Sequence, residues 1–165
     1  MKRSVLLAAG IGVASITTAG VALAQASPNG ADTGPAPAVL SRPRTAADAL
    51  APELVSVGAR KNGPVVSETR LVHQVAGRSI WLAPANTGGV CVLVMMRSGA
   101  ASAGGANCVT FADLKTGPVF RVHTDIGSVD LALAADGAAD AVAGRLSGQV
   151  ATPNVVFVPT APMPE

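Results

Sequence analysis

Residues 90–96 read Val-Cys-Val-Leu-Val-Met-Met, a run of apolar side chains without a single polar position. Successive side chains of a β-strand point to opposite faces of the sheet, so such a run predicts a strand that is buried on both faces. The preceding residues 86–89, Asn-Thr-Gly-Gly, are a turn signal, and Pro84 closes a short apolar segment at 80–83. The stretch therefore predicts the central strand of a sheet.

The predicted central strand also determines how the two cysteines of the chain lie relative to one another. Cys91 lies within it, and Cys108 follows after residues 98–106, which are rich in Gly, Ala and Ser and predict a loop of small residues. A further strand is expected at 107–111, and if the two strands are antiparallel neighbours, the cysteines lie near opposite positions. Because an even, minimal count favours pairing in an oxidising compartment, we expect a Cys91–Cys108 disulfide.

Downstream segments also have the pattern of short strands. Residues 128–134 alternate, with Val129, Leu131 and Leu133 on one face, and Asp136-Gly137 is a hairpin-turn signal. Further strands are expected at 118–123, 139–146, 149–151 and 155–158. About six to eight short strands at this spacing predict a mainly β fold, a small antiparallel sandwich or a partly open barrel.

One or two short helices are expected before the strands. Thr45-Ala46-Ala47-Asp48 resembles a capping box and predicts a short helix that stops before Pro52, and residues 67–76 predict a helical turn leading into a strand. Residues 27–44 are rich in Pro, Ala, Gly and Ser and predict a disordered tether. The sequence thus predicts one β-rich domain over 45–158 and a flexible tail over 159–165.

The first 26 residues have the three parts of a secretory signal peptide. Lys2 and Arg3 form a basic start, an uncharged apolar stretch follows, and Ala22-Leu23-Ala24 and Ala24-Gln25-Ala26 both match the small-x-small cleavage pattern. We expect cleavage after Ala24 or Ala26, and therefore a secreted, extracellular or cell-envelope protein with no stable membrane insertion after cleavage. An uncleaved anchor helix is the alternative, but glycines at 10, 12 and 20 weaken it.

Charge and composition argue against two classes of binding protein. The chain has 12 basic and 10 acidic residues, and removal of Lys2 and Arg3 leaves 10 of each. A nucleic-acid partner needs a dense basic face, so none is expected. The aromatic residues are one Trp, three Phe and no Tyr, which is few for a sugar-binding surface that works by ring stacking.

Catalytic patterns are weak throughout. A hydrolase could use His123 as base, with Asp125 and Ser128, but no Gly-x-Ser-x-Gly elbow surrounds a serine. A zinc site of the cysteines with His73 and His123 lacks the usual close ligand pairs, and a nucleophilic cysteine would have to escape its partner. Asp130, Asp136 and Asp140 do not form a calcium loop. We therefore expect no enzyme activity, no catalytic residue, no metal and no cofactor.

Several of these segments resemble a pattern in small exported proteins of high-GC Gram-positive bacteria. The strings are Ser79-Ile80-Trp81-Leu82-Ala83-Pro84 and Gly88-Gly89-Val90-Cys91-Val92-Leu93, with a second cysteine after a glycine-rich stretch. Asp136-Gly137-Ala138 departs from the late D-G-V turn of that group, and Asn154-Val155-Val156-Phe157 is a variant of its N-V-F tail. The resemblance implies a β architecture and the disulfide, and it implies no activity.

Three functions follow as hypotheses. The first is a non-catalytic extracellular or cell-envelope module that binds another envelope protein. The second is a small secreted inhibitor or effector that presents the Arg97–Ala106 loop from a disulfide-closed hairpin, since a preorganised loop binds at lower entropic cost. The third is a hydrolase that uses His123.

Overall fold

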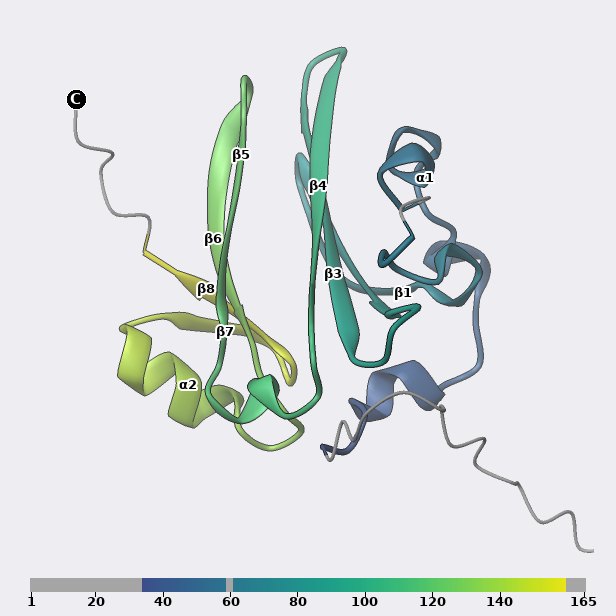
Figure 1. Ribbon diagram of the computed structural model, residues 1–165. Helices are drawn as coiled ribbons and strands as arrows, with labels where there is room; N and C mark the ends of the chain where they lie inside the picture. Colours follow the sequence, from purple (N-terminus) through teal and green to yellow (C-terminus); the bar gives the residue numbers. More distant parts are fainter. Residues whose placement is uncertain (1–33, 59–60, 160–165) are drawn as a thin grey trace, which may run out of the picture.

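Two four-stranded antiparallel sheets face one another in the computed structural model, which describes residues 34–58 and 61–159 (Figure 1). The first sheet has the order β1-β2-β3-β4, with β1 Arg70–Val75, β2 Arg78–Pro84, β3 Val90–Ser98 and β4 Ala101–Val109. The second has the order β5-β6-β8-β7, with β5 Val119–Thr124, β6 Gly127–Leu133, β7 Gln149–Thr152 and β8 Val155–Val158. This confirms the mainly β fold, as an open sandwich and not a closed barrel over the described ranges.

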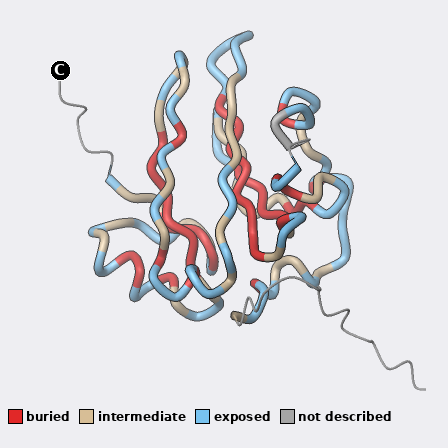
Figure 2. The backbone as a smooth tube through the Cα atoms, in the orientation of Figure 1, coloured by how far each residue is buried: buried red, intermediate tan, exposed pale blue. Residues whose placement is uncertain are grey.

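The main core lies between the two sheets, and Figure 2 shows buried residues along the strands of both. Alternate residues of β3 point into it, and the alternating residues of β6 meet them from the other sheet. Its buried members are Ile80, Leu82, Val90, Val92, Val94, Met96, Leu114, Val122, Val129, Leu131, Leu133 and Val155. The first seven residues of β3 are all buried, as the unbroken apolar run predicted.

Short helices cover the outer face of each sheet. Leu54, from α1 (Pro52–Gly58), packs on Trp81, Leu93 and Met95 of the first sheet. On the second sheet, Val142 and Ala143 of α2 (Ala139–Leu146) pack on Ala132 and Val156. These contacts make the strands next to the helices apolar on both sides, so the protein has four layers.

The strand expected at 139–146 is wrong, because these residues form α2. The segment reads Ala-Asp-Ala-Val-Ala-Gly-Arg-Leu, in which Ala, Arg and Leu favour a helix, and its buried residues Ala139, Val142 and Ala143 share one helical face. Gly137 does adopt the left-handed conformation of a turn, with φ 76°, but the chain leaves it into a helix.

The N-terminal predictions need two corrections. Part of the expected tether, Ala38–Ser41, forms the 3-10 helix η1, whose own residues Val39 and Leu40 pack against the core, so residues 38–41 do not belong to a disordered tether. The capping box at Thr45 is confirmed, but it opens only the 3-10 helix η2 (Ala46–Asp48). The longer helix begins at Pro52, where the missing N–H of proline costs no hydrogen bond.

The other 3-10 helices flank strands. η3 (Val66–Glu68) leads directly into β1, which confirms the predicted turn followed by a strand, and η4 (Asp113–Lys115) joins the two sheets. In the described ranges no helix is long and apolar enough to cross a membrane. The leader expected at 1–26, and most of the tail expected at 159–165, lie outside the described residues.

The small-residue loop expected at 98–106 is also wrong. Residues 98 and 101 pair around a two-residue turn, and the whole segment continues as β4, in register with β3 to its end. Glycines fit here because the space is narrow: a Cβ on Gly104 would lie 2.6 Å from Leu54 Cδ2 of α1. On the other face, a Cβ on Gly105 would lie 3.4 Å from Val122 of β5. The small residues thus form a strand that is closely covered on both faces.

Candidate interaction edge

The predicted disulfide is confirmed. Cys91 of β3 and Cys108 of β4 are directly opposite one another and are bonded, and no cysteine of the described chain is free. The bond excludes both the nucleophilic cysteine and a zinc site that uses the two thiolates. Cys91 is fully buried on the outer face of the first sheet, whereas Cys108 is exposed on β4. The disulfide therefore fastens β4, an outermost strand, to the core of the domain.

The two histidines lie on different faces of the molecule. His73 of β1 points between the sheets, where its ring meets Phe157 of β8 edge to face at 5.2 Å. His123 lies on the exposed end of the β5–β6 hairpin, opposite Ser128, and Asp125 is in the connecting turn. No hydrogen bond joins these three residues in the described part of the chain. The arrangement does not form the linked nucleophile and base that a hydrolase requires.

Asp130 and Asp136 serve separate structural contacts. Asp130 of β6 is buried and accepts two hydrogen bonds from Arg121, at 2.8 and 2.6 Å, and this guanidinium lowers the pKa of the carboxyl group. Asp136 accepts the backbone N–H of Ala38 and the side-chain amide of Asn154, both at 2.7 Å. Within the described ranges, no three His, Cys, Asp or Glu residues are grouped as metal ligands.

A groove of about 860 Å³ crosses the outer face of the first sheet, between residues 47–52 and the β1–β2 hairpin. Its apolar surface includes Leu71, Trp81 and Met95. The guanidinium Nη2 of Arg97, which also lines the groove, lies 3.9 Å from the Oε1 carboxylate oxygen of Glu53 in α1. The described residues that line the groove include no histidine, cysteine or carboxylate. The described lining therefore offers no imidazole or carboxylate to act as a general base.

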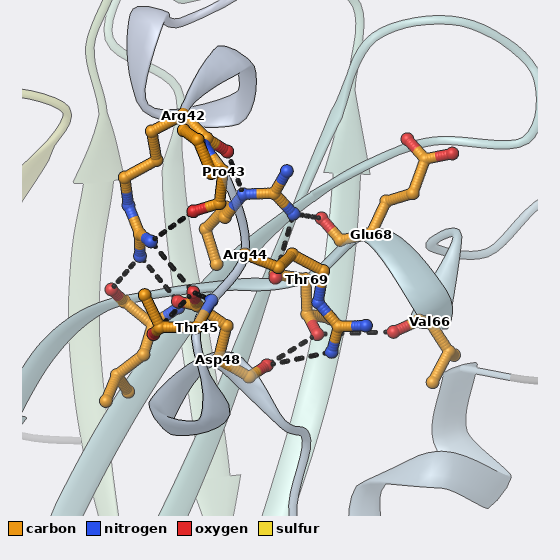
Figure 3. Close-up of polar contacts among 10 residues, drawn as sticks. Arg42, Pro43, Arg44, Thr45, Asp48, Val66, Glu68 and Thr69 are labelled. Atoms are coloured by element: carbon orange, nitrogen blue, oxygen red, sulfur yellow. Dashed lines mark hydrogen bonds and ion pairs between the residues drawn. The ribbon is translucent and has the colours of Figure 1, made fainter.

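The β1 edge of the first sheet is closed by side chains from the N-terminal segment (Figure 3). The Asp48 carboxylate accepts the backbone N–H of Leu71 at 2.7 Å, and the Arg42 guanidinium donates to the Leu71 carbonyl at 3.1 Å. A register shift between Leu71 and His73 also interrupts the strand. Another strand cannot pair with β1 here without first displacing these groups.

Asp48 holds this closure together. Its side chain is buried and accepts a two-pronged hydrogen bond from Arg42, together with the N–H and hydroxyl of Thr45. The Arg42 guanidinium is the main reason that the pKa of Asp48 lies well below its usual range, and the N–H groups of Thr45 and Leu71 act in the same direction. Burial acts the opposite way but is outweighed, so Asp48 stays ionised.

The two edges of the second sheet are protected in other ways. β7 has only four residues and contains a register shift between Val150 and Thr152. β5 has the exposed polar side chains Arg121 and His123 along its outer face. Short strands, bulges and charged side chains are the devices by which proteins prevent unwanted strand pairing.

The β4 edge has none of these devices. Its nine residues, Ala-Ser-Ala-Gly-Gly-Ala-Asn-Cys-Val, include no charge and no proline, its register with β3 is unbroken, and none of them is buried (Figure 2). Among the described residues, the backbone hydrogen bonds of β4 run only to β3. A long, uncharged edge of this kind is a template for another strand.

The register identifies which backbone groups are free. The two-residue turn makes Ser98 and Ala101 a hydrogen-bonded pair, and the alternation of antiparallel pairs then leaves every second residue of β4 directed away from β3. The N–H and C=O groups that point outward are those of Ser102, Gly104, Ala106 and Cys108. They lie at even spacing along the free edge.

Sequence reasoning did not identify this site. The small residues of β4 have the composition of a loop, and the Arg42–Asp48 network that closes the opposite edge joins residues far from β1 in the chain. One signal was present: the lack of any charge or proline between residues 98 and 109, unusual for an exposed loop. Comparisons of this chain with family models, with curated proteins and with solved structures found no match.

Proposed function

We propose that this chain is an exported, non-catalytic interaction module of the extracellular space or cell envelope, which binds its partner by strand addition at β4. The observation that carries the proposal is the contrast among the four sheet edges. β1 is covered and interrupted, β7 is short and interrupted, and β5 bears the polar side chains Arg121 and His123, whereas β4 alone in the described sandwich is both long and uncharged. The expected leader and the disulfide both support an extracellular or cell-envelope location.

Strand addition suits the chemistry of this edge. An incoming strand would be held by main-chain hydrogen bonds to Ser102, Gly104, Ala106 and Cys108, each of which has a free donor and a free acceptor. The Cys91–Cys108 disulfide holds β4 in place before binding, so less conformational entropy is lost when a partner docks.

Neither alternative gains from the geometry. Residues 97–106 form the two strands of a hairpin, so the inhibitor hypothesis loses the loop that it was to present. The hydrolase hypothesis depends on His123 and Ser128, which lie opposite one another without a mutual hydrogen bond on an exposed hairpin.

Site-specific photo-crosslinking in the exporting cells tests the proposal. A photoreactive residue replaces Asn107, which is exposed on β4, and in a matched control it replaces Gly144, which is exposed on α2. We expect a crosslinked product from position 107 and none from position 144. The substitution Ala106→Pro, which removes one outward N–H and no bond to β3, should abolish the product.

Two results would contradict the proposal: equal crosslinking from both positions, or a product from position 107 that persists in the Ala106→Pro chain. A folded Ala106→Pro chain is recognised by its intact disulfide and unchanged circular dichroism. If that variant does not fold, Asn107→Lys in the chain labelled at position 103 replaces it, since a lysine on the edge opposes pairing without altering the β3–β4 ladder.

A further inference from the structure

We infer that the strand which pairs with β4 is β4 of a second copy of this chain, so that two sandwiches join through one continuous eight-stranded sheet. The inference rests on the proposed function, because it names the partner of the same edge. It follows from the space around β4, from the register and from the absence of charge.

The space around β4 restricts the side chains of any partner strand. On the outer face, Leu54 of α1 lies directly over Gly104, and on the inner face Val122 of β5 lies over Gly105. A neighbouring strand enters beside these two covering elements, so large side chains at its centre would meet α1 or β5. The best-fitting partner is an extended, uncharged strand of small residues, and β4 itself has that composition.

Antiparallel pairing of β4 with β4 of a second copy also gives every outward backbone group a partner. With the two-fold axis at Gly105, Ser102 pairs with Cys108 of the second copy, and Gly104 pairs with Ala106. These are the residues whose backbone groups point outward, so each free donor meets a free acceptor. Such a contact is isologous: the same patch is used by both copies, and the assembly closes at two.

The absence of charge allows this self-pairing. Like charges directly opposite one another destabilise a strand pair, and a charged strand would bring its own charges into opposition in an isologous contact. β4 contains no Lys, Arg, Asp or Glu, so the two copies do not repel along the strand. Closure into a dimer also covers both open edges, which in the monomer would be sites of aggregation.

The second copy brings further surface to the contact. In this register the two Gly104 residues are separated by one strand spacing and two residues, about 8 Å. Because α1 lies over Gly104, the two α1 helices come to about the distance at which helices pack. Val55 of α1, the residue after Leu54, is 45% exposed and is an apolar side chain on this helix. The contact therefore extends beyond the strand pair.

Sedimentation of the purified mature chain measures the inference directly. We expect a dimer at micromolar concentration. Ala106→Pro removes one donor in each copy and should weaken association about 100-fold. Asn107→Lys should weaken it at least about 10-fold. The matched control Asn62→Lys adds the same charge at an exposed turn two residues before Pro64, which forms a bridge with Ala85 just after β2, and should leave the dimer unchanged.

A cysteine at the two-fold axis tests the register. The two Gly105 residues are directly opposite in a pair without hydrogen bonds, where Cα atoms approach to about 4.5 Å, so Gly105→Cys should form a covalent dimer on oxidation. Gly144→Cys, in open space on α2, should not.

The outcomes separate the inference from the proposed function. A wild-type chain that is monomeric at micromolar concentration overturns the inference, and so does a dimer that Ala106→Pro and Asn107→Lys leave intact. If the chain is monomeric but position 107 crosslinks to a different protein, the inference fails and strand addition stands. If it is monomeric and position 107 captures nothing, both fail.

Discussion

The first sheet has one closed edge, β1, and one open edge, β4. The two strands are held in place by different contacts. β1 is sealed by a distant segment of the chain, through the buried carboxylate of Asp48 and the guanidinium of Arg42. β4 keeps its outward backbone groups free. It is held by the disulfide to β3, by α1 over Gly104 and by β5 over Gly105. Both edge strands are therefore held in place, but only β4 leaves its outward backbone groups accessible to another strand.

Removing the closure of β1 should have the largest effect on stability. Asp48→Ala leaves the Leu71 N–H without its partner, whereas the Arg42 guanidinium, which is 35% exposed, is partly compensated by water. Because hydrogen bonds to a charged group contribute roughly 1.5–3 kcal/mol each and Asp48 accepts several, the loss should exceed about 3 kcal/mol. Urea unfolding measures the loss. Asp125→Ala, at an exposed turn, is the matched control and should change stability by less than about 0.5 kcal/mol. Equal effects of the two substitutions would show that the Asp48 network does not hold the edge.

Breaking the disulfide should have the next largest effect. The two cysteines are 17 residues apart, and opening a loop of this size costs about 3 kcal/mol on the chain-entropy model. The double substitution Cys91→Ala with Cys108→Ala should lower the urea midpoint and free β4 to fray, while the contacts of β1 persist. Amide exchange that accelerates equally at both edges would contradict this separation.

Acid should loosen the β1 edge in a defined direction. The folded-state pKa of Asp48, and that of Asp130, lies below the unfolded value near 4, so ionisation of these groups stabilises the fold above pH 4. That contribution declines as the pH falls below about 4 towards the folded pKa values. Asp48→Asn should flatten the decline measured by urea unfolding between about pH 4 and 2. A slope unchanged by Asp48→Asn would show that this carboxylate does not carry the acid sensitivity.

The sequence predicted the parts of the fold that depend on local pattern. The unbroken apolar run of β3 and the alternation of β6 place the core, and the cysteine spacing identifies the disulfide. It failed where tertiary contacts decide. Residues 139–146 form a helix because their apolar face meets Ala132 and Val156, and residues 101–106 form a strand because β3 pairs with them. The open edge was not predictable, because β4 is recognised as open only by comparison with the way the other three edges are protected.

Amide hydrogen exchange resolved by residue tests the contrast between the edges most directly. In the wild-type chain the outward amides of Ser102, Gly104, Ala106 and Cys108 should be protected by the second copy, and in Asn107→Lys they should exchange much faster. The inward amides between them, and the Leu71 amide held by Asp48, should be protected in both chains. Outward amides that exchange freely in the wild-type chain at high concentration would contradict the account, since β4 would then be an edge that nothing occupies.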